Sequence, residues 1–124
     1  MRVLVCGGRG YRDVKRVHRV LDDLHFKTPI SALIHGAAVG ADEIAETWAL
    51  SRQIDYCGFP AKWDKYGSAA GPIRNALMIE DGKPDLVIAF PGGRGTANMV
   101  RQAQEAGVEV RHVEIEGHIA ETTT

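Results

Sequence analysis

The sequence predicts a single Rossmann-like α/β domain, with three layers (α/β/α) built around a mainly parallel sheet of five strands. Short apolar runs rich in β-branched residues alternate with longer segments in which apolar residues recur every three or four positions. These are the periods of buried strands and of amphipathic helices. The chain of 124 residues has the length of about one domain. Strands that alternate with helices are joined by right-handed crossovers, so neighbouring strands run parallel.

The first strand has the profile of a strand buried on both faces, and the fourth is the strongest of the five. The third is more polar than the others, which favours a place nearer an edge of the sheet. Residues 1–116 are assigned to the domain, and residues 117–124 to a flexible tail, because the tail lacks apolar periodicity. The five expected strands are residues 3–6, 32–35, 54–59, 86–90 and 108–115.

Four helices are expected between these strands. Asp13 can cap the first helix, and the second begins near Gly40. The third would start with Pro72 in its first position, because proline suits that place. Arg74 is then in the third position, after a long loop over residues 60–71. Thr96 can cap the fourth helix, which ends at a glycine.

Composition excludes several classes of protein. Lys plus Arg is 15 and Asp plus Glu is 16, a net charge of −1, which argues against a general nucleic-acid coat. The two cysteines, Cys6 and Cys57, are too few for a disulfide scaffold and look like apolar strand residues in a reducing compartment. No apolar run approaches the ~20 residues of a membrane span. The first strand also meets a glycine turn too early for a signal peptide. We therefore expect a cytoplasmic protein without a membrane partner.

A glycine-rich turn after the fourth strand is the strongest functional signal. It reads Pro-Gly-Gly-Arg-Gly-Thr at residues 91–96, where glycine lets the backbone approach a ligand without a Cβ in the way. The start of the following helix offers unpaired N–H groups and a partial positive charge, which favour an anion such as phosphate. The hydroxyl of Thr96 could serve the same anion. A tight turn without any ligand is the alternative for such a segment.

Two further loops would face the same sheet edge, because each follows a strand. In residues 7–11, Arg9 could pair with phosphate and Tyr11 could stack on a base or ribose; a turn with a solvated arginine is the alternative. Residues 35–42 end with Asp42 in the first turn of a helix. Its carboxylate could complement the helix dipole, accept a ribose hydroxyl or stabilise a cationic transition state.

The loop of residues 59–75 completes the candidate site. Trp63 could form a lid or simply pack the loop, and Arg74 could point at the same anion. The histidines and cysteines show no metal-ligand spacing, so no metal and no cofactor is expected. A Walker lysine and a Gly-x-Ser-x-Gly elbow are also absent. The expected ligand-binding residues are Gly7, Gly8, Arg9, Gly36, Gly40, Asp42, Trp63, Arg74, Asn75, Pro91, Gly92, Gly93, Arg94, Gly95 and Thr96.

With these segments in place, the chain resembles the SLOG superfamily, which includes Lonely Guy-type phosphoribohydrolases and DprA/Smf proteins. It is most similar to the YspA/YpsA-like family, over about residues 2–113. The resemblance implies a Rossmann-like pocket for a nucleotide-derived ligand, with phosphate at the 91–96 turn. The residues that carry it are Gly7-Gly8-Arg9, Asp13, His35-Gly36-Ala37, Gly40-Ala41-Asp42, Trp48-Ala49, Phe59-Pro60-Ala61, Trp63, Gly67, Ala70-Gly71-Pro72, Arg74-Asn75, Phe90-Pro91-Gly92-Gly93 and Gly95-Thr96.

The resemblance also implies how catalysis would work, and where this chain departs from it. Lonely Guy-type enzymes cleave the N-glycosidic bond of nucleoside 5′-monophosphates with an arginine and a glutamate. Arg74 resembles that arginine, whereas the glutamate position holds Met99. A thioether can neither stabilise an oxocarbenium ion nor activate water, although Asp42 could substitute for the glutamate from another loop.

Three functions are therefore weighed. The first is a sensor or carrier that binds a nucleotide derivative, such as an ADP-ribose-like molecule. The second is a nucleotide N-glycosidase with Arg74 and Asp42, or Asp64, in catalytic roles. The third is single-stranded DNA binding by analogy with DprA, on a basic first helix (Lys15, Arg16, Arg19), although nucleic acid is disfavoured against a solvated surface. Residues 1–30 hold seven basic and three acidic residues and residues 104–124 hold one and five, which also permits a homo-oligomer.

Overall fold

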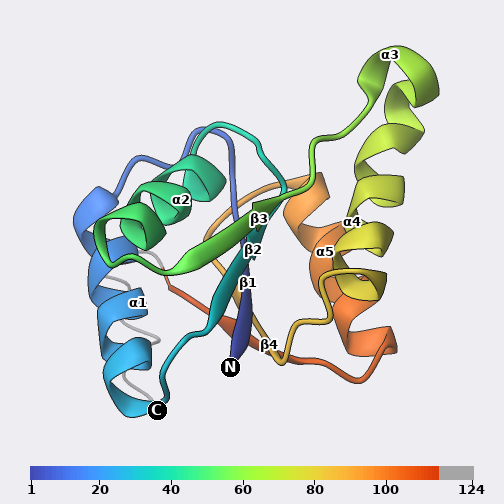
Figure 1. Cartoon of the computed structure of the whole chain (residues 1–124). Coiled ribbons are helices and arrows are strands. Elements are labelled where there is room, and N and C mark those ends of the chain that lie inside the picture. The colour runs from blue at the N-terminus through green and yellow to red at the C-terminus, as the bar shows by residue number, and fades with distance from the viewer. Residues whose placement is uncertain (115–124) are drawn as a thin grey trace.

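Five strands form one parallel sheet in a computed structural model of the chain, which describes residues 1–114. They lie in the order β3-β2-β1-β4-β5, so the chain extends the sheet on one side of β1 and then returns to extend it on the other (Figure 1). The order reverses between β1 and β4, the position at which open α/β sheets bind ligands. The strands are β1 (Arg2–Cys6), β2 (Ala32–His35), β3 (Asp55–Gly58), β4 (Leu86–Ala89) and β5 (Glu109–His112).

Helices cover both faces of this sheet, which confirms the three-layer α/β/α prediction. Helices α1 (Val14–Lys27) and α2 (Ala41–Ser51) lie on one face, and α4 (Ala70–Glu80) and α5 (Arg94–Glu105) on the other (Figure 1). Alternate residues of β1 enter the two cores: Val3 and Val5 join the cluster of α1 and α2, and Leu4 and Cys6 join that of α4 and α5. A strand covered on both faces must be apolar throughout, which explains its uninterrupted apolar sequence.

The polar third strand lies at an edge, as predicted, and this position corrects the expectation for one cysteine. All four residues of β3 are exposed, including Cys57, whereas Cys6 is buried. An edge strand lacks a neighbour on one side, so an apolar character for Cys57 was the wrong inference. Both cysteines are free.

The expected loop of residues 60–71 is largely helical. A short helix, α3 (Trp63–Tyr66), continues through the single turn η1 (Gly67–Ala69) into α4. Helix α4 therefore begins at Ala70, so Pro72 is its third residue and Arg74 its fifth, instead of the first and third. Proline is tolerated there because the N–H groups of a first turn have no partner within the helix.

Of the two helix-capping predictions, the one for Asp13 is confirmed and the one for Thr96 is wrong. Asp13 caps α1, since its carboxylate accepts the backbone N–H of Arg16 at 3.1 Å. Thr96 does not cap α5, because the helix begins at Arg94 after Gly93 and Thr96 lies within the first turn. The end of the last predicted strand and the tail of residues 117–124 lie outside the described residues. Within residues 1–114, no helix combines the length and apolar character that a membrane span needs.

Candidate functional site

A cavity of about 730 Å³ opens at the carboxyl end of β1, bounded by the starts of α4 and α5. This volume lies within the range of small-molecule sites, roughly 300–1,000 Å³. The cavity lies at the strand-order reversal, where the loop after β1 leads to one face of the sheet and the loop after β4 leads to the other. The predicted residues that line it are Gly7, Gly8, Arg9, Asp42, Trp63, Arg74, Asn75, Gly93, Arg94, Gly95 and Thr96.

The other predicted residues, Gly36, Gly40, Pro91 and Gly92, pack the loops against one another and do not line this cavity. The N–H of Gly8 donates to the Pro91 carbonyl at 2.9 Å, which joins the loops after β1 and β4. A Cβ on Gly92 would overlap the Thr96 hydroxyl and lie 2.7 Å from the Gly8 nitrogen. Gly40 and Gly92 need glycine because backbone atoms approach closely there, whereas a Cβ on Gly36 would meet the side chains of Arg74 and Asp42. Their contribution to the site is to hold its walls together.

Tyr11 also belongs to the packing of the loops. Its ring lies 5.4 Å from that of Phe90, centroid to centroid, and it packs against the core of α1 and α2. It is outside the set of residues that line the cavity. Stacking of Tyr11 on a base or ribose therefore has no support from the geometry.

Positive charge dominates the lining. Four guanidinium groups line the cavity, those of Arg9, Arg74, Arg94 and Arg101, against the one carboxylate of Asp42 within the described chain. Guanidinium groups stay protonated at neutral pH and offer a planar fork of N–H donors. This surplus favours an anionic ligand, above all one with the oxygen geometry of a phosphate or carboxylate.

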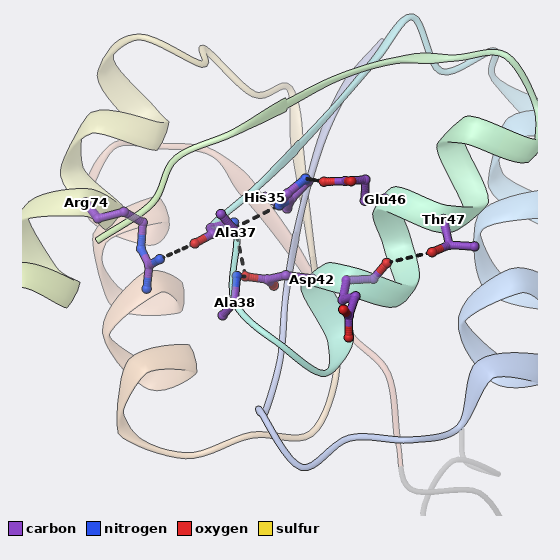
Figure 2. A network of polar contacts seen from close by, with 9 residues as sticks. His35, Ala37, Ala38, Asp42, Glu46, Thr47 and Arg74 are labelled. Atoms are coloured by element: carbon purple, nitrogen blue, oxygen red, sulfur yellow. Dashed lines mark hydrogen bonds and ion pairs between the residues drawn. The ribbon is translucent and has the colours of Figure 1, made fainter. Parts of the chain in front are cut away.

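Arg74 is held in place by backbone acceptors. Its Nη1 donates to the Gly36 carbonyl (Figure 2). The same nitrogen donates to the Phe59 carbonyl at 3.4 Å, while Nε donates to Asn75 Oδ1 at 2.9 Å. Burial lowers the pKa of Arg74; the Asp42 carboxylate opposes this effect and the Arg9 charge adds to it. The hydrogen bonds found in residues 1–114 use Nε and Nη1, which leaves the second terminal nitrogen for a ligand.

Asp42 organises the loop after β2. Its side chain is 7% exposed, and its carboxylate accepts the N–H groups of Gly36 at 3.1 Å and of Ala38 at 3.4 Å (Figure 2). Between them, Ala37 has a φ of +57°, in the left-handed region, and its N–H donates to His35 Nδ1 at 2.9 Å. The other nitrogen of His35 lies 2.8 Å from a Glu46 carboxylate oxygen. The loop that presents the Gly36 carbonyl to Arg74 is thus fixed by buried polar contacts.

Replacing Asp42 with asparagine is expected to change how stability depends on pH. Burial raises the pKa of Asp42 above its ordinary value of 3.8, although the charges of His35 and Arg74 and two N–H groups oppose this. The folded protein therefore binds a proton more tightly than the unfolded chain. The contribution of Asp42 to stability is largest below about pH 4 and is lost as the pH rises through the folded pKa.

The measurement is urea unfolding of the wild type and the Asp42→Asn variant between about pH 4 and pH 7. The stability of the wild type relative to the variant should fall as the pH increases. A relative stability that rises over this range would mean that the carboxylate is favoured by folding, contrary to the effect of its burial.

Asn75 connects α4 to the start of α5. Its side chain is 2% exposed and its Nδ2 donates to Asn98 Oδ1 at 3.0 Å and to the Gly95 carbonyl at 3.3 Å. Asn98 and Arg101 also line the cavity, although sequence reasoning missed them. A signal was present: with Arg94 they recur at four and three positions, the spacing of one helix face.

Trp63 forms the rim. The guanidinium carbon of Arg9 lies 5.3 Å from the centre of the Trp63 ring, a cation–π contact between the loop after β1 and α3. Trp63 is 46% exposed, so it can contact both the cavity and solvent.

Met99 lines the cavity, is 1% exposed and belongs to the core cluster that also contains Met78 of α4. The position at which Lonely Guy-type enzymes carry glutamate is therefore filled by a buried apolar side chain. Of the acidic side chains in residues 1–114, that of Asp42 is the one that lines the cavity.

Comparison with known proteins places this chain in a family. The model of the family described as "YspA, cpYpsA-related SLOG family" (YAcAr) matches residues 1–66. The chain belongs to this SLOG family. The matched part of the YAcAr chain contains the loops after β1 and β2, and the 91–96 turn lies beyond it. The family resemblance predicted from the sequence is confirmed.

Two individual proteins resemble this YAcAr chain. The gene 61 protein of Mycobacterium phage D29 is 40% identical over 117 residues, which cover 88% of this chain and 93% of that protein. The solved structure of DNA processing protein A (DprA) from Streptococcus pneumoniae matches 97% of this chain with a TM-score of 0.73 and 20% identity. The chain spans about half, 53%, of that DprA chain. At this identity, the likeness to DprA shows a shared fold.

Proposed function

We propose that this domain binds the phosphate of a nucleotide or nucleotide-derived small molecule and acts as a sensor or carrier. The observation that carries the proposal is the cavity lining, which combines four arginines and the start of a 12-residue helix with one acidic residue in the described chain, Asp42. Arg74 is partly buried and the other three arginines are exposed. Arginines beside a helix N-terminus favour a dianion through both charge and hydrogen bonds.

The start of α5 supports phosphate as the anchoring group. Gly93 precedes the helix, and in the described chain no side chain hydrogen-bonds to the first N–H groups as a cap. Such groups need a partner from water or a ligand. Phosphate oxygens would accept them while Arg74 approaches from the side of α4.

Binding without cleavage is favoured over an N-glycosidase. Cleavage of that bond needs a carboxylate that can stabilise positive charge or activate water. Met99 cannot do this, and the Asp42 carboxylate is already engaged by the N–H groups of Gly36 and Ala38. The proposed phosphate site would then serve recognition instead of turnover.

Calorimetry with AMP, GMP, CMP, UMP and inorganic phosphate tests the proposal, together with mass spectrometry of whatever co-purifies with the protein. At least one nucleotide should bind more tightly than phosphate itself. Absence of binding across the panel would overturn the proposal. Incubation with the same nucleotides and NAD should yield no free base; release of base that disappears in Asp42→Asn would establish the N-glycosidase instead.

A further inference from the structure

A buried histidine contacts the loop that holds Arg74. His35 is the last residue of β2 and is 2% exposed. Its Nδ1 accepts the N–H of Ala37 at 2.9 Å, and its Nε2 lies 2.8 Å from a carboxylate oxygen of Glu46 in α2 (Figure 2). His35 is outside the set of residues that line the cavity. Any effect of this side chain on a ligand must therefore pass through the loop.

The contact with the loop fixes the protonation state of the ring. A ring nitrogen that accepts an N–H carries no proton of its own, so the contact with Ala37 requires the neutral imidazole with its proton on Nε2. A proton added to Nδ1 would face the N–H of Ala37, and two donors at this distance repel each other. The loop after β2, in the conformation described, therefore fits only the neutral ring.

The carboxylates around His35 act in the opposite direction. Those of Glu46 and Asp42, both in α2, attract a protonated ring. Glu46 lies within ion-pair distance of Nε2, but the angle is not that of a hydrogen bond. From β3, the Tyr56 ring stacks on the imidazole with centroids 6.1 Å apart, and from α4 the Arg74 cation contacts the same loop. In acid, the two carboxylates therefore favour a proton that the N–H of the loop opposes.

One peptide unit joins His35 to Arg74. The N–H of Ala37 and the carbonyl of Gly36 belong to the same planar peptide bond. The N–H points to His35 Nδ1, and the carbonyl accepts from Arg74 Nη1 (Figure 2). Ala37 also has a φ of +57°, which a residue with a Cβ seldom adopts, so the contact with the ring helps to hold it. If the N–H turns away from a protonated ring, the carbonyl must turn away from Arg74.

We propose that His35 is a positioning residue for the anion site and that its protonation weakens anion binding in acid. The neutral ring holds the Gly36–Ala37 peptide so that the carbonyl orients the guanidinium of Arg74. Protonation of Nδ1 turns this peptide, and Arg74 loses a contact that fixes its direction. The inference rests on the proposed function, because it takes an anion beside Arg74 as the ligand.

The first test needs no ligand. Nitrogen-15 NMR of the wild type follows the His35 ring, the Ala37 amide and the Arg74 Nε–H from about pH 8 to pH 5, the range in which histidines titrate. At pH 8 the ring should carry its proton on Nε2. On acidification, the Ala37 and Arg74 signals should shift with the same midpoint as the ring. An Arg74 signal that stays constant while the ring titrates contradicts the inference, and so does a ring that takes up no proton in this range.

The second test compares the wild type with His35→Asn by calorimetry at pH 8 and pH 5, using the monophosphate that binds best in the panel above. The asparagine places an amide oxygen near the position of Nδ1, so it keeps an acceptor for Ala37 but does not take up the proton. The titration of the phosphate affects both proteins alike. The affinity of the wild type relative to the variant should therefore fall about two- to tenfold from pH 8 to pH 5, the factor for one neutral hydrogen bond.

His25→Asn is the matched control. Nδ1 of His25, in the last turn of α1, accepts the N–H of Ile30 at 2.9 Å, and His25 does not line the cavity. The variant changes the same kind of contact at a different place. The affinity of the wild type relative to His25→Asn should stay constant between the two pH values.

The outcomes separate this inference from the proposed function. If the monophosphate binds and the ratio for His35→Asn is the same at both pH values, the inference is wrong and the proposed function stands. If no monophosphate binds to the wild type, the proposed function fails and the effect on affinity fails with it. If His35→Asn does not fold, the coupled shifts of His35 and Arg74 in the wild-type spectra decide the inference.

Discussion

Replacing Gly40 with alanine is expected to destabilise the protein by about 3 kcal/mol or more. Gly40 has a φ of +87°, which strains any residue with a Cβ. The added Cβ would overlap the Gly8 carbonyl oxygen and lie 2.6 Å from that of Arg9. Both neighbours are backbone atoms, so relief requires the loops after β1 and β2 to separate. Urea unfolding measures the loss.

Gly10→Ala is the matched control. Gly10 lies in the same group of loops, is exposed, and its added Cβ would meet no atom within 4 Å. We expect a change of less than about 0.5 kcal/mol. Similar losses for the two variants would show that the close approach of the loops at Gly40 contributes nothing to stability.

The second large effect is on ligand binding. Arg74→Gln should weaken binding of the best nucleotide about 10- to 100-fold, as expected for losing charged hydrogen bonds of roughly 1.5–3 kcal/mol. Arg74 lines the cavity, keeps one terminal nitrogen outside its contacts within residues 1–114, and is the arginine anchored by the Gly36 carbonyl. Calorimetry with the wild type and variant, at one salt concentration, provides the measurement.

Two further variants show whether this loss is specific. Lys15→Gln removes the same charge from an exposed residue of α1 that does not line the cavity, and should change the affinity by less than about twofold. Arg74→Lys keeps the charge but loses the planar fork, so its affinity should fall between those of wild type and Arg74→Gln. If Arg74→Gln and Lys15→Gln lost the same ligand affinity, Arg74 would contribute only through the net charge of the protein and not through direct contact with the ligand.

Most of the fold could be predicted from the sequence because its three central strands are largely apolar and the apolar residues of its helices recur every three or four positions. The apolar run Leu86–Ala89 fits a central parallel strand, which is buried on both faces. The polar residues of β3 fit a strand at the edge of the sheet. The starts of α4 and α5 were harder to predict. Proline and threonine are compatible with several positions of a first turn, so Pro72 and Thr96 do not fix where the helix begins.

The loops that form the site could be predicted from the sequence, but the contacts between their residues could not. Arg74 and Asp42 line the cavity as expected, yet the sequence does not reveal that both contact Gly36. Glycines that pack backbone against backbone, such as Gly40 and Gly92, read the same in a sequence as glycines that face a ligand. Arg101 was missed because it lies two turns into α5, beyond the motif that drew attention.

The tight glycine packing has a consequence for how such a site can change. Gly40 and Gly92, which lie outside the cavity lining, hold the surrounding loops in close contact, so a substitution there changes the loop packing before it changes ligand preference. New ligand preferences must therefore arise at the border, where Arg9, Trp63 and Arg101 project from separate elements. For the proposed anion site, the glycine packing would stay constant while the residues at the border vary with the group attached to the anion.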